Sequence, residues 1–325
     1  MTILVTGAAG FIGSHVARLL LARGEAVIGV DSLNAYYDPE LKRARLARLE
    51  GERGFTFHEI DVSDRAAMLS LAESAPEIEG IVHLAAQAGV RHSLEDPYAY
   101  VTANVMGQLV AMEAARRLPA LKHLVYASSS SVYGESSPLP FSTEHPADDP
   151  VSLYAATKRA DELMAQSYAN LHGLPLTGLR IFTVYGPWGR PDMSLFLFTK
   201  AVLAGETIRV FNRGRMKRDF TYIDDLADGV VRALDRPPGA GAASSHRIYN
   251  LGNARQESLM DMIAAVEAAC GREAIKEFVE MQPGDVTETW AEIGPARRDL
   301  GFDPKTTIAE GVPRFVAWFR DYYAL

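Results

Sequence analysis

Gly7-Ala8-Ala9-Gly10-Phe11-Ile12-Gly13 follows the apolar run Thr2-Ile3-Leu4-Val5 and precedes an amphipathic stretch that ends at Gly24. This order predicts a strand, a glycine-rich turn and a helix. Glycine lets the backbone approach a pyrophosphate closely, and a helix N-terminus offers unpaired N–H groups and positive potential. The stretch therefore predicts the dinucleotide-binding turn of an α/β domain.

A second apolar run, Ala26-Val27-Ile28-Gly29-Val30, ends at Asp31. A carboxylate at this place can accept a hydrogen bond from a ribose 2′-OH and would repel a 2′-phosphate. We therefore expect NAD rather than NADP as the cofactor. The alternative, a glycine turn that binds nothing, is disfavoured because strand, turn, helix, second strand and terminal acid occur together.

Strands and helices alternate through the first half of the chain. Further strands are predicted at 55–60, 81–85, 123–127 and 176–182, with helices around 64–74, 98–117 and 152–172. The alternation indicates right-handed βαβ units and a Rossmann-type, doubly wound parallel sheet whose ligands lie at the carboxyl ends of the strands. Beyond residue 182 the pattern becomes irregular, which predicts a smaller C-terminal α/β lobe over the open end of the sheet. The run from Pro237 to Ser245 predicts a surface loop.

Tyr154 and Lys158 are four residues apart in the last of these helices, and Ser129 follows the strand at 123–127. Four residues are just over one turn, so the phenol and the ammonium project from the same face. A free phenol titrates near pH ~10, so a base acting near neutrality needs on the order of 4 kcal/mol of phenolate stabilisation, which a nearby cation can supply. Ser129 could hydrogen-bond the same substrate oxygen. Alone, Tyr-x-x-x-Lys is usually solvated surface, but beside a nicotinamide site it predicts oxidoreductase chemistry.

Composition limits the other classes of function. The 325 residues carry a net charge of −8, which argues against a nucleic-acid partner. The single cysteine, Cys270, excludes an internal disulfide and a thiolate metal cluster, and the histidines lack ligand spacing, so we expect no metal. No run reaches membrane-spanning length, and the first strand is predicted at residue 2, so we expect no membrane partner and a cytoplasmic protein.

The G-x-x-G-x-x-G turn with Tyr-x-x-x-Lys resembles the extended branch of the short-chain dehydrogenase/reductases. The stretches Arg218–Asp225 (RDFTYIDD) and Pro283–Val286 (PGDV) resemble members that act on nucleotide sugars. The longer stretches Asn34–Pro39 (NAYYDP), His83–Arg91 (HLAAQAGVR) and Phe182–Met193 (FTVYGPWGRPDM) are similar to the UDP-glucuronate 4-epimerases. The resemblance covers nearly the whole chain.

This resemblance implies an isomerase that oxidises and re-reduces C4 of a UDP-uronic acid with a recycled NAD. UDP-glucuronate would become UDP-galacturonate through a transient 4-keto sugar, without decarboxylation. Tyr154 would act as base and later as acid, Lys158 would hold the nicotinamide ribose, and Ser129 would polarise the C4 oxygen. The implied cofactor contacts are Gly7, Gly10, Phe11, Ile12, Gly13, Asp31, Asn34, Asp61, Val62, Leu84, Ala85, Ala86, Gln87, Tyr154 and Lys158. The implied substrate contacts are Arg91, Ser129, Ser130, Tyr154, Thr183, Arg190, Met193, Arg218 and Asp285.

The 4-keto uronate is a β-keto acid that loses carbon dioxide when its carboxylate stands perpendicular to the carbonyl plane. A hydroxyl and a guanidinium can hold the carboxylate in another orientation, and the resemblance assigns Thr183 and Arg190 to this task, with Arg91 near the pyrophosphate or sugar. Related dehydratases have Asp-Glu at Ser130-Ser131, and related decarboxylases have Glu at the second of these positions. Elimination needs a positioned acid and base, so the two serines favour epimerisation.

The resemblance also places Arg218 at the nucleotide diphosphate and Asp285 at the nucleotide ribose. Related UDP-galactose 4-epimerases carry an arginine three residues before this acid, where the present chain has Gln282. Arg215 or Lys217 could replace it.

The resemblance further implies an NAD-binding domain at 1–181 and a lobe at 182–325 that mainly binds the nucleotide sugar, with about 220–255 returning to the first domain. Related enzymes pair the helices at 98–117 and 152–172 as a four-helix interface, so we expect a homodimer. Two alternatives remain. One is a UDP-glucose/UDP-galactose 4-epimerase, which has no need for Arg190. The other is a non-catalytic NAD-sensing protein, which need not keep Tyr154, Lys158 and Ser129.

Overall fold

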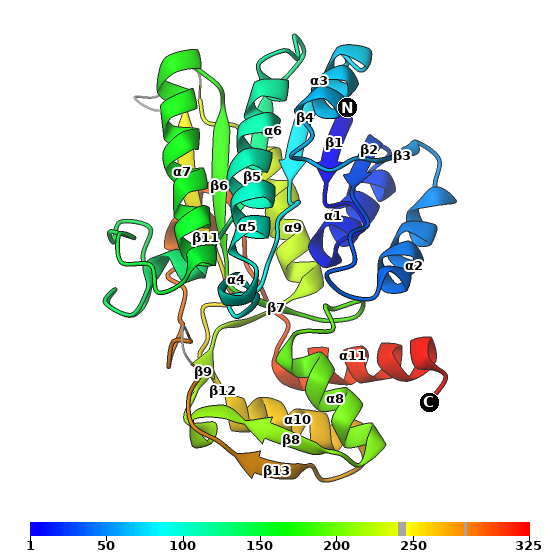
Figure 1. Cartoon of the computed structure of the whole chain (residues 1–325), viewed down its shortest axis with the longest axis vertical. Coiled ribbons are helices and arrows are strands. Elements are labelled where there is room, and N and C mark those ends of the chain that lie inside the picture. The colour runs from blue at the N-terminus through cyan, green and yellow to red at the C-terminus, as the bar shows by residue number, and fades with distance from the viewer. Residues whose placement is uncertain (240–244, 283–284) are drawn as a thin grey trace.

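The central sheet has the predicted α/β architecture. The structure, a computed structural model, describes residues 1–239, 245–282 and 285–325. Seven strands lie in the order β11-β6-β5-β4-β1-β2-β3, and each neighbouring pair is parallel (Figure 1). They are β1 (Thr2–Thr6), β2 (Ala26–Asp31), β3 (Phe55–Glu59), β4 (Ile78–His83), β5 (His123–Ser129), β6 (Leu176–Ile181) and β11 (His246–Leu251). The strand order reverses between β1 and β4, which is where doubly wound sheets bind their ligands.

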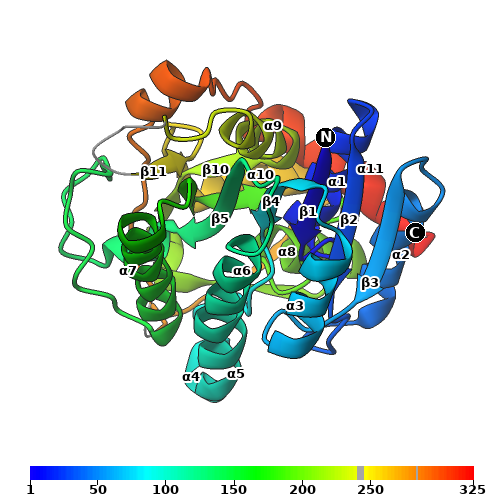
Figure 2. The same cartoon turned by 90° about the horizontal axis from the view of Figure 1, so that it is seen from above.

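Helices cover both faces of this sheet. On one face lie α3 (Arg65–Ser74), α6 (Gly107–Ala115) and α7 (Leu153–His172), and on the other lie α1 (Phe11–Ala22) and α9 (Ile223–Leu234), with α2 (Pro39–Glu50) beside α1 (Figure 2). Because both faces are covered, β1, β2 and β4 are buried along most of their length, whereas the edge strand β3 alternates and stays partly exposed. The two faces have separate apolar clusters. We call this assembly the sheet domain.

The C-terminal lobe is a set of short strand pairs backed by helices. The pairs are β7 (Thr183–Tyr185) with β10 (Phe220–Tyr222), β9 (Lys217–Arg218) with β12 (Glu257–Ser258), and β8 (Thr207–Val210) with β13 (Ile275–Phe278). Helices α8 (Ser194–Ala204), α10 (Leu259–Cys270) and α11 (Ile308–Tyr323) lie beyond the carboxyl ends of the sheet strands (Figure 1). One apolar cluster runs from α1 and α9 into Phe196, Phe315 and Phe319 of this lobe, so lobe and sheet domain share a core.

The chain enters the lobe, returns to the sheet and leaves it again. After β10, α9 packs against α1, and β11 adds to the sheet beside β6. Short helical turns complete the fold: α4 (His92–Glu95), α5 (Pro97–Tyr100), η1 (Val101–Met106), η2 (Ser130–Tyr133), η3 (Phe211–Gly214) and η4 (Ala296–Leu300). Within the predicted loop 237–245, residues 240–244 lie outside the described part, as do residues 283 and 284 of the PGDV stretch. None of the described helices combines the length and apolarity that a membrane span requires.

Three predicted boundaries differ from the structure. The first helix begins at Phe11, inside the glycine stretch, with Gly10 as its N-cap. The predicted helix at 98–117 consists of α5, the π-helical η1 and α6. The wider turn of η1 carries Asn104 inward, where its Nδ2 donates to Gln87 O at 3.1 Å and to Thr157 Oγ1 at 2.9 Å. The sixth strand ends at Ile181, and Thr183 begins β7, which pairs outside the main sheet.

Candidate active site

A cavity of about 1190 Å³ lies between the carboxyl ends of the sheet strands and the C-terminal lobe. Every residue that the sequence predicted at the cofactor or the substrate lines this cavity. The sheet domain contributes the glycine turn, Asp31 and the segments after β3, β4 and β5, and the lobe contributes Arg190, Arg218 and Asp285. The topology thus gathers one site from segments that are far apart in sequence.

The glycine turn is closed by its own backbone. Gly7 has φ +71°, and a Cβ at this residue would lie 2.8 Å from Ala85 N. A Cβ at Gly13 would lie 2.0 Å from Gly7 O, so a side chain at either position would open the turn. Helix α1 begins at this turn without a side-chain cap on its N-terminus. The turn therefore presents a helix N-terminus to the cavity, as a pyrophosphate requires.

Asp31 and Gln87 complete a cradle that suits a dinucleotide. Asp31 Oδ2 accepts from Ala9 N at 3.2 Å and Oδ1 accepts from Leu33 N at 2.9 Å, which fixes the carboxylate at the end of β2. Gln87 is buried at the cavity wall, and its Nε2 has no hydrogen-bond partner within the described protein. A buried amide donor without a partner is costly unless a ligand satisfies it. Glycine turn, fixed carboxylate and orphaned donor together fit NAD.

The residues of the predicted redox set are brought together by α7 and β5. Ser152 caps α7, because its Oγ accepts from Ala155 N at 3.1 Å, and this fixes Tyr154 in the first turn. The Tyr154 ring packs edge-on against Tyr100, with centroids 6.1 Å apart. Ser129 ends β5, and its Oγ accepts from Ser131 N at 3.2 Å.

Lys158 forms a buried ion pair on the same helix. Its Nζ lies 3.0 Å from Asp161 Oδ2, and the two side chains are 3% and 1% exposed. Burial raises the pKa of Asp161 to about 6, against the opposing charge of Lys158. His83 lies close by on β4, and burial, with the Lys158 charge, lowers its pKa to about 3. His83 is therefore neutral, and its Nδ1 is 2.8 Å from Thr6 Oγ1.

A second buried charge cluster lies between α7 and the strands β5 and β6. Glu162 accepts hydrogen bonds from Ser128 Oγ at 2.7 Å and from Arg180 Nε and Nη2, both at 2.8 Å. Arg159 Nη1 donates to it at 2.9 Å. Burial alone would raise the pKa of Glu162, but the Arg180 hydrogen bonds and charge hold it below its ordinary value. The Glu162 carboxylate therefore links α7 to β5 and β6, one helical turn after Lys158.

On the lobe side, residues 186–193 connect β7 to α8, and we call them the 186–193 loop. Arg190 Nε donates to Asp192 Oδ1 at 3.0 Å and Arg190 Nη2 donates to Asp192 Oδ2 at 2.5 Å. Tyr36, from the segment after β2, donates its hydroxyl to Asp192 Oδ2 at 3.3 Å. Thr183 is half-buried and lines the same cavity.

Arg45 of α2 fixes the start of this loop. It is fully buried, and its Nε and Nη2 donate to Trp188 O at 3.0 and 2.8 Å. Its Nη1 donates to Tyr37 OH at 2.6 Å and to Ala9 O at 3.3 Å in the glycine turn. Trp188 has φ +66°, a left-handed conformation that a non-glycine residue keeps only when its surroundings hold it. One guanidinium therefore links the glycine turn to the 186–193 loop.

At the far end of the cavity, Asp285 lies between two arginines. Arg218 Nη2 is 3.1 Å from Asp285 Oδ1, and Arg91 Nη2 is 3.3 Å from Asp285 Oδ2. The Arg91 guanidinium also lies over the Phe211 ring, 5.1 Å from its centroid, and Arg209 lies 5.4 Å from that centroid. These cations and the ring form a surface suited to an anionic nucleotide.

Comparison with known proteins identifies the chain. Residues 3–252 match the model of the NAD dependent epimerase/dehydratase family. The chain belongs to this family. It is 46% identical to a probable UDP-glucuronate 4-epimerase of Rhizobium meliloti (strain 1021), over 99% of this chain and 98% of that protein. It is 44% identical to UDP-glucuronate 4-epimerase 4 of Arabidopsis thaliana, over 100% of this chain and 76% of that protein.

A solved family member shares the whole architecture. The UDP-glucuronic acid 4-epimerase from Bacillus cereus, in complex with UDP-glucuronic acid and NAD, superposes with a TM-score of 0.91 at 34% identity. The match covers 99% of this chain and 100% of that chain. The resemblance found in the sequence motifs is thereby confirmed for the family.

Several cavity residues of this epimerase/dehydratase family member escaped the sequence analysis. Tyr36 and Asp192 lie inside the quoted NAYYDP and FTVYGPWGRPDM stretches, so the motifs contained them without indicating their contacts. The sequence around Arg209 and Phe211 contains no motif that predicts a binding site, so neither residue was expected at the cavity. Of the described residues, Arg209 and Gln282 both line the cavity, whereas Arg215 and Lys217 are not among the lining residues.

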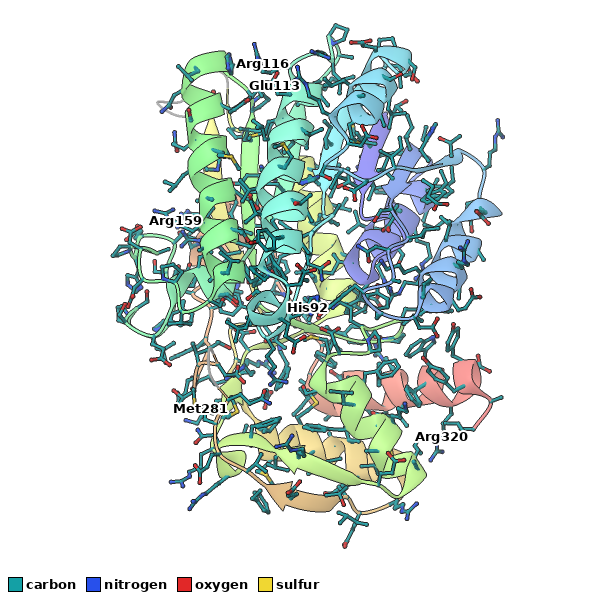
Figure 3. The ribbon with its side chains drawn as sticks, in the orientation of Figure 1. His92, Glu113, Arg116, Arg159, Met281 and Arg320 are labelled. Carbon is teal, nitrogen blue, oxygen red and sulfur yellow. The ribbon has the colours of Figure 1, made fainter. Side chains whose placement is uncertain are left out.

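The side-chain view separates the site from the surface. Figure 3 shows His92 between the sheet domain and the lobe, and His92 lines the cavity. Glu113 and Arg116, an ion pair of 2.8 Å, lie at the far end of α6. Within the described ranges, no group of three or more His, Cys, Asp or Glu side chains is placed to hold a metal ion.

Proposed function

We propose that this protein is an NAD-dependent isomerase that epimerises C4 of a UDP-uronic acid. It interconverts UDP-glucuronate and UDP-galacturonate through a transient 4-keto sugar and keeps the carboxylate. The observation that carries the proposal is that one cavity contains both the redox set of α7 and β5 and the Thr183–Arg190 pair. The three relatives described above are named as UDP-glucuronate or UDP-glucuronic acid 4-epimerases, which supports the same substrate class.

The two parts of the fold divide the ligands between them. We assign NAD to residues 1–181 together with about 220–255, and the nucleotide sugar mainly to the remainder of 182–325. The glycine turn would hold the pyrophosphate, Asp31 a ribose hydroxyl pair, and Lys158 the nicotinamide ribose. When bound, NAD supplies a reversible acceptor for the hydrogen on C4 of the sugar.

Three side chains, Tyr154, Ser129 and Lys158, handle the proton of the C4 hydroxyl. Tyr154 takes the proton of the C4 hydroxyl while Ser129 hydrogen-bonds the same oxygen, and Tyr154 later returns the proton to the inverted centre. The Lys158 ammonium stabilises the phenolate electrostatically. With serines at 130 and 131, the site offers no acid–base pair for elimination at the neighbouring carbons. The sugar therefore leaves as an epimer.

The lobe side recognises the rest of the substrate. Arg190 and Thr183 would bind the uronate carboxylate through charge-assisted and neutral hydrogen bonds. Arg218 and Arg91 would neutralise the diphosphate, and Asp285 would accept from the nucleotide ribose. In the described structure Asp285 is the counter-ion of both arginines, so it holds their side chains at the cavity wall.

A direct assay tests the proposal. The purified protein is incubated separately with UDP-glucuronate and UDP-glucose, and the C4 epimers and carbon dioxide are quantified. We expect UDP-galacturonate from UDP-glucuronate, with little carbon dioxide and no added NAD required. Equal turnover of UDP-glucose would instead favour the UDP-glucose/UDP-galactose 4-epimerase. Retained NAD without turnover of either sugar would favour the NAD-sensing protein.

We further propose a homodimer formed through α7 and the α5–α6 segment, which lie side by side on one face of the molecule (Figure 2). Large apolar side chains on these elements are exposed: Leu171, Leu163, Tyr98, Val101 and Met106. Such a grouping is typical of a protein–protein interface. Light scattering after gel filtration should give twice the mass of the chain, and Leu163→Glu should halve it. A monomeric wild-type protein would contradict the proposal.

A further inference from the structure

Arg190 forms a bidentate pair within the 186–193 loop. Its Nε and Nη2 donate to the two carboxylate oxygens of Asp192 at 3.0 and 2.5 Å, a bidentate fork that fixes the plane of the guanidinium. The two side chains are only 22% and 31% exposed, so water competes weakly for these bonds. The Arg190 guanidinium can still donate from Nη1 and from the second hydrogen of Nη2 to another partner.

Asp192 is itself held from across the cavity. The Tyr36 hydroxyl donates to Asp192 Oδ2 at 3.3 Å, and Tyr36 belongs to the sheet domain whereas Asp192 belongs to the 186–193 loop. Burial, and then the Asp192 charge, raise the pKa of Tyr36 to about 12, so it stays a neutral donor. Burial alone would raise the pKa of Asp192, but the charge of Arg190 outweighs this and lowers it. The three side chains thus form a fixed network of phenol, carboxylate and guanidinium.

We propose that Asp192, supported by Tyr36, is a positioning residue that sets the orientation of Arg190 and thereby decides whether the 4-keto uronate keeps its carboxylate. The inference rests on the proposed function. A flexible arginine could follow the substrate carboxylate through many orientations. A guanidinium fixed in advance accepts the carboxylate in one plane, and it does so without ordering its own side chain on binding.

The side reaction that this network prevents is decarboxylation of the oxidised sugar. The C5–C6 bond breaks, carbon dioxide leaves, and the electron pair forms a C4–C5 enolate whose oxygen carries the charge. A solvent proton then adds at C5 and gives a UDP-4-keto-pentose, while the electrons removed from C4 remain with the reduced cofactor. The C5–C6 bond must stand perpendicular to the carbonyl plane for this, so the orientation of the carboxylate controls the outcome.

Asp192 has an opposite effect on binding. Its negative charge lies beside the position that Arg190 would offer to the substrate carboxylate, and like charges repel. Removing the charge should therefore leave the KM for UDP-glucuronate unchanged or lower it, even as the orientation is lost. A residue that merely maintained the fold would raise KM or lower kcat and would not alter the ratio of products.

The experiment compares product ratios in matched variants. Asp192→Asn, Asp192→Glu and Tyr36→Phe are assayed with UDP-glucuronate, and UDP-galacturonate, UDP-4-keto-pentose and carbon dioxide are quantified. Asp228→Asn makes the same chemical change at the Arg232–Asp228 pair of α9, whose side chains are 40% and 49% exposed, and serves as the control. Bound NAD and the thermal transition are measured for each variant.

In Asp192→Asn we expect the fraction of turnovers that lose carbon dioxide to rise by about tenfold, the effect of one charge-assisted hydrogen bond. Tyr36→Phe should show a rise of about threefold, because it removes one weaker contact. Asp192→Glu keeps the charge and should lie between the wild type and Asp192→Asn, and the control should match the wild type.

A wild-type product ratio in Asp192→Asn, or a fall in kcat without carbon dioxide, would overturn the inference. If Asp192→Asn does not fold, Tyr36→Phe decides, since it removes a single oxygen atom and a wild-type product ratio there would overturn the inference alone. Failure of the wild-type protein to epimerise UDP-glucuronate is a separate result, and it would contradict the proposed function itself.

Discussion

Helix α7 and the 186–193 loop both contribute to the same cavity but hold their charged groups in different ways. On α7, Lys158 and Asp161 are neighbours on one helix, and Glu162 beneath them is buried among Arg180 and Ser128. In the loop, Arg190 depends on Asp192 and on Tyr36 from the opposite part of the fold. The charged groups of α7 are therefore held within the sheet domain, whereas those of the loop are held partly across the cavity. Loss of turnover and loss of selectivity should separate along this division.

The largest effect is expected on the redox side. Tyr154→Phe removes the hydroxyl that exchanges the proton, so turnover should fall by roughly 10³-fold, within the range for a lost general acid–base group. Bound NAD, measured after denaturing the protein, should stay at the wild-type level because the glycine turn is untouched. Undiminished activity would contradict the mechanism.

The next largest effect is a loss of unfolding free energy when the buried Glu162 cluster of α7 is broken. Glu162→Gln leaves Arg180 buried without its counter-charge, and breaking a buried pair costs roughly 3 kcal/mol or more of unfolding free energy. Urea denaturation measures this change. Glu40→Gln is the matched control, because the Glu40–Arg43 pair is 3.5 Å long and its two side chains are 76% and 59% exposed. That control should cost less than about 0.5 kcal/mol. An equal loss in both would remove the contrast between buried and exposed charge.

The loop should respond in selectivity rather than in stability. Arg190→Met keeps the apolar stem and removes the charge, so kcat/KM for UDP-glucuronate should fall about 30-fold, as expected for loss of a charged hydrogen-bond donor. Its unfolding free energy should fall by less than that of Glu162→Gln, because the Arg190–Asp192 pair is more exposed than the Glu162 cluster. A larger stability loss in Arg190→Met would show that the loop, too, is a structural element.

The smallest effect concerns pH and arises mainly from buried histidines of the sheet domain. Burial lowers the pKa of His15, His123 and His246 to about 4 and that of His83 to about 3. All four lie in the sheet domain, on α1, β4, β5 and β11. In the unfolded chain these histidines bind protons near pH ~6.5, whereas in the folded protein they stay neutral. The free energy of unfolding therefore falls as the pH drops below that value.

Two buried carboxyls oppose this trend. Burial raises the pKa of Asp161 and Asp219 to about 6, so each favours the folded state as the pH falls. The four histidines outweigh them, and unfolding free energy should drop by on the order of 1 kcal/mol between pH ~6.5 and ~6.0. Urea titrations at the two values measure the change. A rise in stability over this interval would mean that the carboxyls dominate.

Much of the fold could be predicted because its signals are local. The glycine turn, the apolar strands and the alternation with helices each repeat within a few residues, and a parallel sheet follows from that alternation. The helix boundaries near Phe11 and Asn104 were missed for a physical reason. Helix α1 starts inside the turn, and the π-helical η1 depends on contacts of Asn104 with Gln87 and Thr157, which are distant in sequence.

The sequence by itself determined the candidate residues Tyr154 and Lys158 and the glycine stretch, because the first two are one helical turn apart and the third forms its own turn. Only the tertiary structure decided what surrounds them. The sequence did not indicate the contacts of Asp192. In the fold, Tyr36 donates a hydrogen bond to Asp192, and Arg45 donates to Trp188 O in the same loop. Periodicity and spacing report what a segment does within itself, whereas the contact of Tyr36 with the Arg190–Asp192 pair joins residues that are far apart in the sequence.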